Sequence, residues 1–206
     1  VSDGLMMQSG QLFYITRKVL GETSLRDLLD DYEGRLSLLE LKRINNASEA
    51  GGADMYESLL RIFNYVWTRD IDGDDQVLLL HWFDSASVSW PDKGFLVGAV
   101  WLSKANRFCP LGAALLIRLS NHAIHQVSSR ARVSLMLSLF QHGNRWEISP
   151  RLTGMLATLM DQKNMHELMF QTLINIVRTR ETDRIARKMN EEIFPELLKA
   201  QPLLRE

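Results

Sequence analysis

Apolar residues recur at three- and four-residue spacing along almost the whole chain, and this pattern constrains the fold more than any other sequence feature. One stripe, about four turns long, comprises Leu25, Leu28, Leu29, Tyr32, Leu36 and Leu39. A second predicted buried face comprises Tyr56, Leu59, Leu60, Phe63, Val66 and Trp67. Short connections between 105 and 182 favour antiparallel neighbours. The sequence therefore predicts an all-α fold of about ten helices, either an irregular bundle or HEAT/armadillo-like stacked helix pairs.

Turn and capping residues divide the chain into these helices. We predict helices over 5–20, after caps at Thr23 and Asp54, and over about 76–87, 94–107, 111–127 and 130–141. Further helices are predicted to begin at Ser149-Pro150, after a cap at Asn164 and at Thr182, and Pro195 ends or kinks the last of them. Asn164 with Glu167 has the spacing of a capping box. Segment 130–141 alternates apolar residues with serine and would also suit a buried strand. Helix is favoured there because no partner strand is visible.

Charge is distributed unevenly along the 206 residues, although the formal net charge is only -1. Residues 22–92 contain 15 acidic and 6 basic residues, whereas residues 93–160 contain one acidic residue, Glu147, and eight basic ones. The length suits one domain. We therefore predict a single helical domain, 1–206, with a sub-division near 88–93 into an acidic helical part, 1–90, and an apolar helical part, 91–206. The continuous apolar segments 94–102 and 111–124 are the predicted hydrophobic centre.

The compartment is inferred from what the sequence lacks. The single cysteine, Cys109, cannot form an internal disulfide, which is typical of a reducing environment. No run of 18 apolar residues occurs, and the first residues lack the pattern of a signal peptide. These observations predict an intracellular, cytoplasmic protein without a membrane span.

Catalytic and cofactor motifs are not apparent in the sequence. Nucleophilic catalysis needs a base beside a serine or cysteine, and Cys109 precedes a proline between two apolar segments, where a buried thiol is the ordinary outcome. Gly94 and Gly98 do not begin a phosphate-binding pattern, and no strand precedes them. We therefore expect no enzymatic activity, no catalytic residue and no cofactor.

Two segments resemble metal sites only in part. The acidic turn at 70–75 aligns with a calcium loop, but Thr68 and Leu79 would then occupy the first and twelfth ligand positions, which require carboxylates. A solvated turn with Gly73 at positive φ is the preferred interpretation. His122 and His125 lie three residues apart on one predicted helix, but two further zinc ligands at recognised spacing are missing. No metal site is predicted.

The acid-poor middle region provides the predicted contact residues. They lie at predicted helix ends and combine one aromatic anchor with four cations: Trp146, Arg145, Arg130, Arg132 and Arg151. The sequence thus predicts a non-enzymatic protein–protein interaction, scaffold or regulatory module that binds an acidic protein partner through a helical surface. The alternative is an RNA- or DNA-binding protein that uses the same arginines, although the region is no richer in basic residues than the whole chain. The oligomeric state is left open.

Overall fold

The computed structural model describes residues 13–18, 20–21, 23–44, 52–106, 108–147, 149–188 and 191. Its main elements are α2 (Leu25–Ile44), α3 (Gly52–Thr68), α4 (Gly73–Asp84), α5 (Trp90–Asn106), α6 (Pro110–Leu119), α7 (His125–Glu147), α8 (Pro150–Met160) and α9 (Met165–Lys188). No described residue belongs to a strand, so the predicted all-α fold is confirmed and 130–141 is helical. None of the described helices is both long and apolar enough to cross a membrane.

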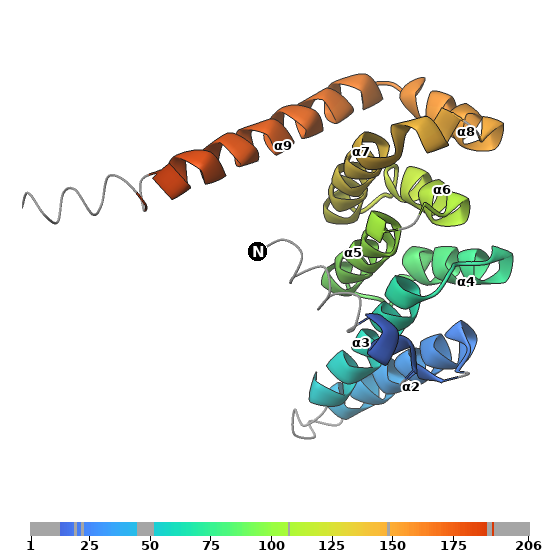
Figure 1. Ribbon diagram of the computed structural model, residues 1–206. Helices are drawn as coiled ribbons and strands as arrows, with labels where there is room; N and C mark the ends of the chain where they lie inside the picture. The colour runs from blue at the N-terminus through green and yellow to red at the C-terminus, as the bar shows by residue number, and fades with distance from the viewer. Residues whose placement is uncertain are drawn as a thin grey trace, which may run out of the picture. The chain divides into compact units, whose positions relative to one another are not determined.

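The chain forms two compact units, 1–160 and 161–206, and α2 to α8 lie in the first. Within that unit the helices stack in two layers (Figure 1). Helices α3, α5 and α7 pack on one another in succession, and α2, α4, α6 and α8 do the same beside them. Contacts of α2 with α3, and of α6 with both α5 and α7, join the layers. The stacked helix arrangement among the sequence-based alternatives thus describes this unit well.

The core of this unit is centred on aromatic side chains and on helix α6. The Trp82 ring makes edge contacts with Tyr32 and Phe83, with ring centroids 5.6 and 5.4 Å apart, and all three side chains are almost fully buried. Every residue from Gly112 to Ile117 is also buried. The predicted apolar centre over 111–124 is therefore correct for helix α6, which packs against α4, α5, α7 and α8.

Side chains cap the starts of α2 and α4, and the caps predicted at Thr23 and Asp54 are not the ones that the structure uses. The Ser24 hydroxyl, rather than Thr23, accepts the Asp27 N–H at the start of α2 at 3.2 Å. At α4 the Asp75 N–H donates to the Asp72 carboxylate at 2.8 Å. Helix α3 begins at Gly52, so Asp54 lies in the first helical turn instead of at the cap. Local side-chain chemistry places such starts only to within one or two residues.

The acidic turn before α4 is shorter than predicted. Gly73 is already the first helical residue, and the only glycine at positive φ among the described residues is Gly21. Because Asp72 satisfies the first turn of α4, the helix starts three residues earlier than expected. The predicted role of Gly73 at positive φ is therefore wrong.

The two histidines considered for zinc do not share a helix. Helix α6 ends at Leu119 and α7 begins at His125, so His122 lies in the turn between them. His122 Nδ1 accepts the Ile124 N–H at 3.0 Å, and Nε2 lies 3.0 Å from the carbonyl oxygen of Phe83. We assign the proton to Nε2 on this pattern. His122 thus ties the α6–α7 turn to the end of α4.

The C-terminal helix is longer than the sequence suggested. Helix α9 continues through Thr182, where a new helix was predicted to begin. The Thr182 hydroxyl donates to the Arg178 carbonyl oxygen at 2.9 Å, a bond that lets threonine stay within a helix. Asn164 precedes α9 with a positive φ of 67°, and the predicted stop at Pro195 lies outside the described residues.

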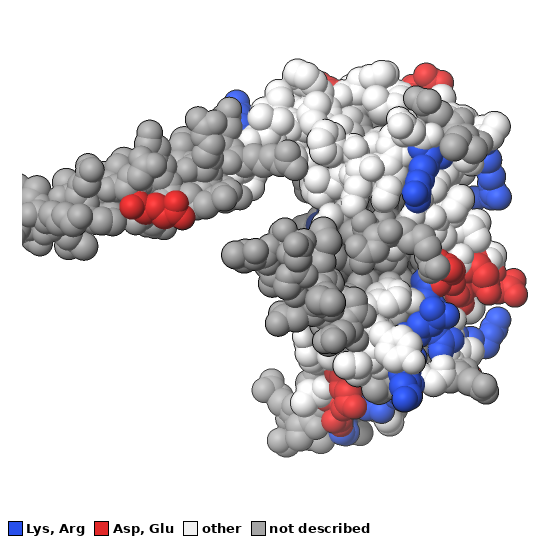
Figure 2. All heavy atoms as spheres, in the orientation of Figure 1, with Lys and Arg blue, Asp and Glu red and all other residues white. Residues whose placement is uncertain are grey.

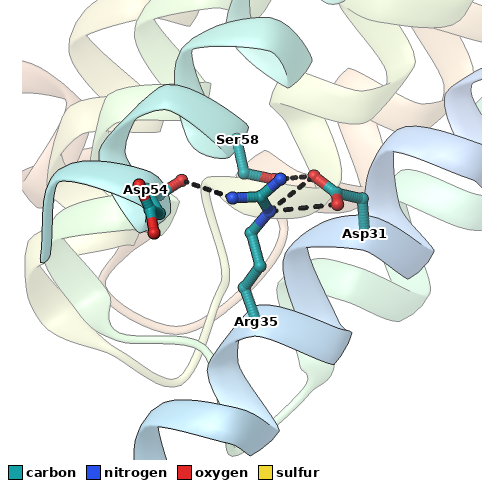
Figure 3. Close-up of polar contacts among 4 residues, drawn as sticks. All are labelled: Asp31, Arg35, Asp54 and Ser58. Carbon is teal, nitrogen blue, oxygen red and sulfur yellow. Dashed lines mark hydrogen bonds and ion pairs between the residues drawn. The ribbon is translucent and has the colours of Figure 1, made fainter. Parts of the chain in front are cut away.

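A polar cluster joins α2 to α3 (Figure 3). Arg35 Nε donates to both carboxylate oxygens of Asp31 at 3.0 and 2.9 Å, and the Ser58 hydroxyl donates to Asp31 Oδ2 at 2.8 Å. Arg35 Nη1 also reaches the Asp54 carbonyl oxygen at 3.5 Å. Burial acts to raise the pKa of Asp31, but the hydrogen bonds from Ser58 and Arg35 and the charges of Arg35 and Arg61 outweigh it. The pKa therefore lies below its usual 3.8.

We expect Asp31→Asn to lower the free energy of unfolding by about 1 kcal/mol at neutral pH. The depressed pKa means that the carboxylate stabilises the fold above the unfolded-state pKa, and that this contribution is lost as the pH falls through the folded-state pKa. Urea unfolding across pH should therefore show the variant and the parent converging in acid. Asp30→Asn, at the exposed neighbouring carboxylate, is the control. A constant difference at all pH values would contradict this account.

Candidate partner-binding groove

An apolar groove of about 400 Å³ lies between helices α5 and α7. It is lined by Gly94, Val97, Gly98 and Trp101 from α5 and by Ser129, Arg130, Val133, Ser134 and Leu137 from α7. These positions recur at helical spacing, so each set lies along one face of its helix. We call this feature the α5/α7 groove.

Two glycines one helical turn apart reduce the side-chain volume on the α5 side of the groove. A Cβ atom on Gly98 would meet no heavy atom within 4 Å, so the space above this residue is open. A Cβ atom on Gly94 would lie 3.1 Å from both Cδ and Nη1 of Arg130. The Arg130 side chain therefore lies across Gly94 and places its guanidinium at the groove.

We expect Gly98→Ala to raise the free energy of unfolding by about 0.5–1 kcal/mol, because alanine favours the helix and the new methyl group meets open space. Gly94→Ala should give less or none of this gain, since Arg130 must move. Gly154→Ala in α8, which also meets open space, provides the reference value. Urea denaturation measures all three. A lower free energy of unfolding in Gly98→Ala would contradict the open space above Gly98, because it would mean that other atoms occupy the groove.

The charge of the groove is positive. Arg130 is exposed and makes no hydrogen bond or ion pair with any residue in the described part of the chain. No aspartate or glutamate occurs in the sequence from 93 to 146. In Figure 2 the largest group of acidic side chains lies at the level of α4, and the surface above it at the level of α6 is basic or uncharged. The groove can therefore attract a carboxylate through Arg130.

The neighbouring lysine contributes to the fold instead of to this surface. Lys93 is only 2% exposed, and its Nζ donates to the Ser85 carbonyl oxygen at 2.7 Å. Burial lowers the pKa of Lys93, partly offset by the charge of Asp84. Its hydrogen bond links the first turn of α5 to the end of α4.

An aromatic row lies on the adjoining helices α3 and α5. Phe63 stacks on Phe95 with ring centroids 4.5 Å apart, and the row continues to Tyr56 at 6.4 Å from Phe95 and to Trp67 at 6.5 Å from Phe63. Tyr56 is 59% exposed, and the other three rings are half-buried. The interpretation of Tyr56 as buried is therefore wrong, because Tyr56 stands at the end of the row and contacts the ring of Phe95 there. The row gives the α3–α5 side an apolar surface.

The structure separates the five predicted contact residues. Trp146 is 3% exposed and packs edge-on against Phe108, with ring centroids 5.7 Å apart. Arg132 is 6% exposed, and its guanidinium donates to the Ser120 carbonyl oxygen at 3.2 Å and to the Ser129 hydroxyl at 3.0 Å. The exposed positions predicted for these two side chains are not found, since both face inward from α7.

The three remaining predicted residues are exposed, but they do not form one patch. Arg130 and Arg145 are 15 positions apart on α7, roughly 22 Å along a helix. A break at His142, with φ -126° and ψ 24°, lies between them. Arg151 is in α8. Only Arg130 lines the α5/α7 groove, so it is the one predicted residue that the groove retains. Binding by Arg145 and Arg151 stays a prediction.

Sequence reasoning missed the rest of the groove. The sequence does contain two pairs of groove residues that are four positions apart: Gly94 with Gly98, and Val133 with Leu137. Each pair marks one helical face, but nothing in the sequence showed that the two faces meet. The contact between α5 and α7 supplies that information.

Other features of the described residues do not form a comparable surface. A hollow of about 420 Å³ lies beside α2, but its Arg35 and Asp31 are bound to each other. No group of three histidine, cysteine, aspartate or glutamate side chains suited to a metal ion occurs in this part of the chain. Cys109 is buried at the start of α6. We therefore take the α5/α7 groove as the candidate site.

Comparison with known proteins gives no relative from which a function could be transferred. The chain matches no protein-family model, no curated protein and no solved structure.

Proposed function

We propose that this protein is a non-enzymatic interaction module whose α5/α7 groove binds a segment of a partner protein that carries apolar side chains and a carboxylate. The observation that supports this most strongly is the combination of an apolar groove with one exposed arginine at its rim. Apolar contact supplies affinity, and the charged contact fixes orientation and selects the partner.

The dimensions and lining of the groove favour a helix or extended peptide as the bound segment. Its walls are two helices, and one of them carries two glycines, which lets another backbone approach closely. Val133 is 39% exposed and Val97 is fully buried, so the groove offers both a rim and a floor of aliphatic carbon. The acid-free stretch from 93 to 146 disfavours a basic partner segment and favours an acidic one.

Selection from a random peptide library on the purified chain tests this proposal. The recovered peptides should combine apolar residues with aspartate or glutamate, and they should bind Gly98→Phe at least about tenfold more weakly, because the phenylalanine fills the groove. Gly154→Phe, on a helix outside the groove, should bind them as the parent does. Peptides that bind both variants equally would overturn the proposal.

Nucleic acid is the competing ligand, and the same variants distinguish it. A fluorescent single-stranded oligonucleotide at low salt should show no binding that depends on Gly98 or Arg130. An oligonucleotide affinity that falls steeply with salt and is lost in Arg130→Glu would replace the peptide proposal with nucleic-acid binding.

A further inference from the structure

The aromatic row and the α5/α7 groove lie on either side of helix α5. This helix packs between α3 and α7 (Figure 1), with the row on its α3 side and the groove on its α7 side. Phe95 of the row directly follows Gly94 of the groove and precedes Gly98 by three residues. The space above Gly98 is open, so the backbone of a bound segment can cross α5 there. The two features therefore form one surface over three helices.

An aromatic side chain from another part of the chain already packs on one end of the row. The Phe13 ring contacts the Trp67 ring edge-on, with ring centroids 5.9 Å apart and an angle of 88° between the planes. Arg69 holds the chain that follows Phe13, since its guanidinium donates to the carbonyl oxygens of Gly21 and, at 3.4 Å, of Thr23. The row thus accepts an aromatic ring, and the chain itself occupies the Trp67 end.

The other end of the row is exposed. Tyr56 is 59% exposed, and its ring centroid lies 6.4 Å from that of half-buried Phe95. This is also the end nearer to Gly94 along α5, where the Arg130 side chain lies. A second aromatic ring can pack on Tyr56 and Phe95 as Phe13 packs on Trp67.

Charge determines in which direction a bound segment crosses α5. Arg130 is exposed on the α7 side, whereas exposed Glu57 follows Tyr56 on the α3 side. A carboxylate is therefore attracted to the α7 side and repelled from the α3 side. The aromatic residue of the segment then belongs on α3 and its acidic residue on α7.

We propose that the partner segment crosses α5 as an extended chain, with an aromatic side chain on Tyr56 and Phe95 and a carboxylate three residues away at Arg130. Packed helices lie about 8–10 Å apart, so the row and the groove are separated by roughly that distance. An extended chain covers it in about three residues, at ~3.3 Å each. This inference rests on the proposed function of the α5/α7 groove and specifies the partner that the groove selects.

Fluorescence polarisation on the full chain tests the aromatic contact. The probe is a labelled peptide recovered from the random library. Tyr56→Ala should bind it at least about tenfold more weakly, and Tyr56→Phe, which keeps the ring, should bind it as the parent does. Changing the aromatic residue of the peptide to alanine should cost the parent about tenfold but Tyr56→Ala no more than about twofold, because that contact is already lost. Circular dichroism checks that both variants remain helical.

The positions of the two residues in the peptide test the crossing. A peptide in which the acidic residue is moved next to the aromatic one can no longer reach both sides of α5, and the parent should bind it at least about fivefold more weakly. Equal binding of both peptides, or recovered peptides that lack an aromatic residue, would overturn the inference.

The remaining outcomes separate this inference from groove binding itself. A peptide that Gly98→Phe excludes, but that Tyr56→Ala binds as tightly as the parent does, would overturn the aromatic contact and leave the groove function standing. A peptide that binds Gly98→Phe as it binds the parent would overturn the proposed function and this inference with it. A single-stranded oligonucleotide whose binding falls steeply with salt and is lost in Tyr56→Ala would assign the row to nucleic acid instead.

Discussion

Replacing Arg132 by glutamate is expected to lower the free energy of unfolding by about 3–5 kcal/mol. Arg132 is 6% exposed, and its guanidinium donates to the carbonyl oxygen of Ser120 at 3.2 Å. A glutamate there would bury a carboxylate beside that oxygen, with the Ser129 hydroxyl as a nearby donor. Burial lowers the pKa of Arg132, because a buried site disfavours the charged form of a side chain.

Arg130→Glu is the matched control for this substitution. It makes the same chemical change two residues away, but on an exposed side chain, and should alter the free energy of unfolding by no more than about 0.5 kcal/mol. Urea denaturation followed by circular dichroism measures both. Equal stability of the two variants would show that Arg132 is not held in the interior.

The second large effect is expected at Trp146. Trp146→Ala should lower the free energy of unfolding by about 3–5 kcal/mol, because it removes a buried ring and leaves a cavity beside Phe108. Trp146→Phe should cost less. The indole Nε1 is buried and has no hydrogen-bond partner among the described residues, so phenylalanine removes this polar group along with part of the ring.

Trp90→Ala separates this core role from a general effect of removing tryptophan. Trp90 is 45% exposed at the start of α5, and its replacement should change the free energy of unfolding by about 1 kcal/mol or less. Thermal and urea unfolding give both values. If Trp146→Ala were as stable as Trp90→Ala, this would contradict the buried position of Trp146. Trp146 would then again be a candidate contact residue.

Helical spacing predicted the elements well where local chemistry marks their ends. Cys109 followed by Pro110 starts α6, and Ser149 followed by Pro150 starts α8, because proline at the first helical position loses no hydrogen bond. The break predicted at Thr182 failed because a threonine hydroxyl can bond within the helix as readily as it caps one. Local signals of this kind show where a helix can start, but they do not show that the preceding helix has ended.

The contact residues could not be predicted as reliably, because their positions depend on which face of α7 meets which neighbour. Arg132 shares a buried face with Ala131 and Leu135, whereas Arg130 shares the groove face with Val133 and Leu137. Both sets fit the same helical periodicity, and the two arginines are only two residues apart. Packing of α7 against both α5 and α6 decides which arginine is exposed.

A charge exchange between Arg130 and a selected peptide tests groove binding most directly. Fluorescence polarisation of a labelled peptide gives the affinity of the parent and of Arg130→Glu, each for the original peptide and for one with its acidic residue changed to lysine. We predict that Arg130→Glu lowers the affinity for the original peptide at least about tenfold. The lysine peptide should bind Arg130→Glu with the affinity that was lost. Unchanged binding to Arg130→Glu, or no recovery with the lysine peptide, would contradict the account.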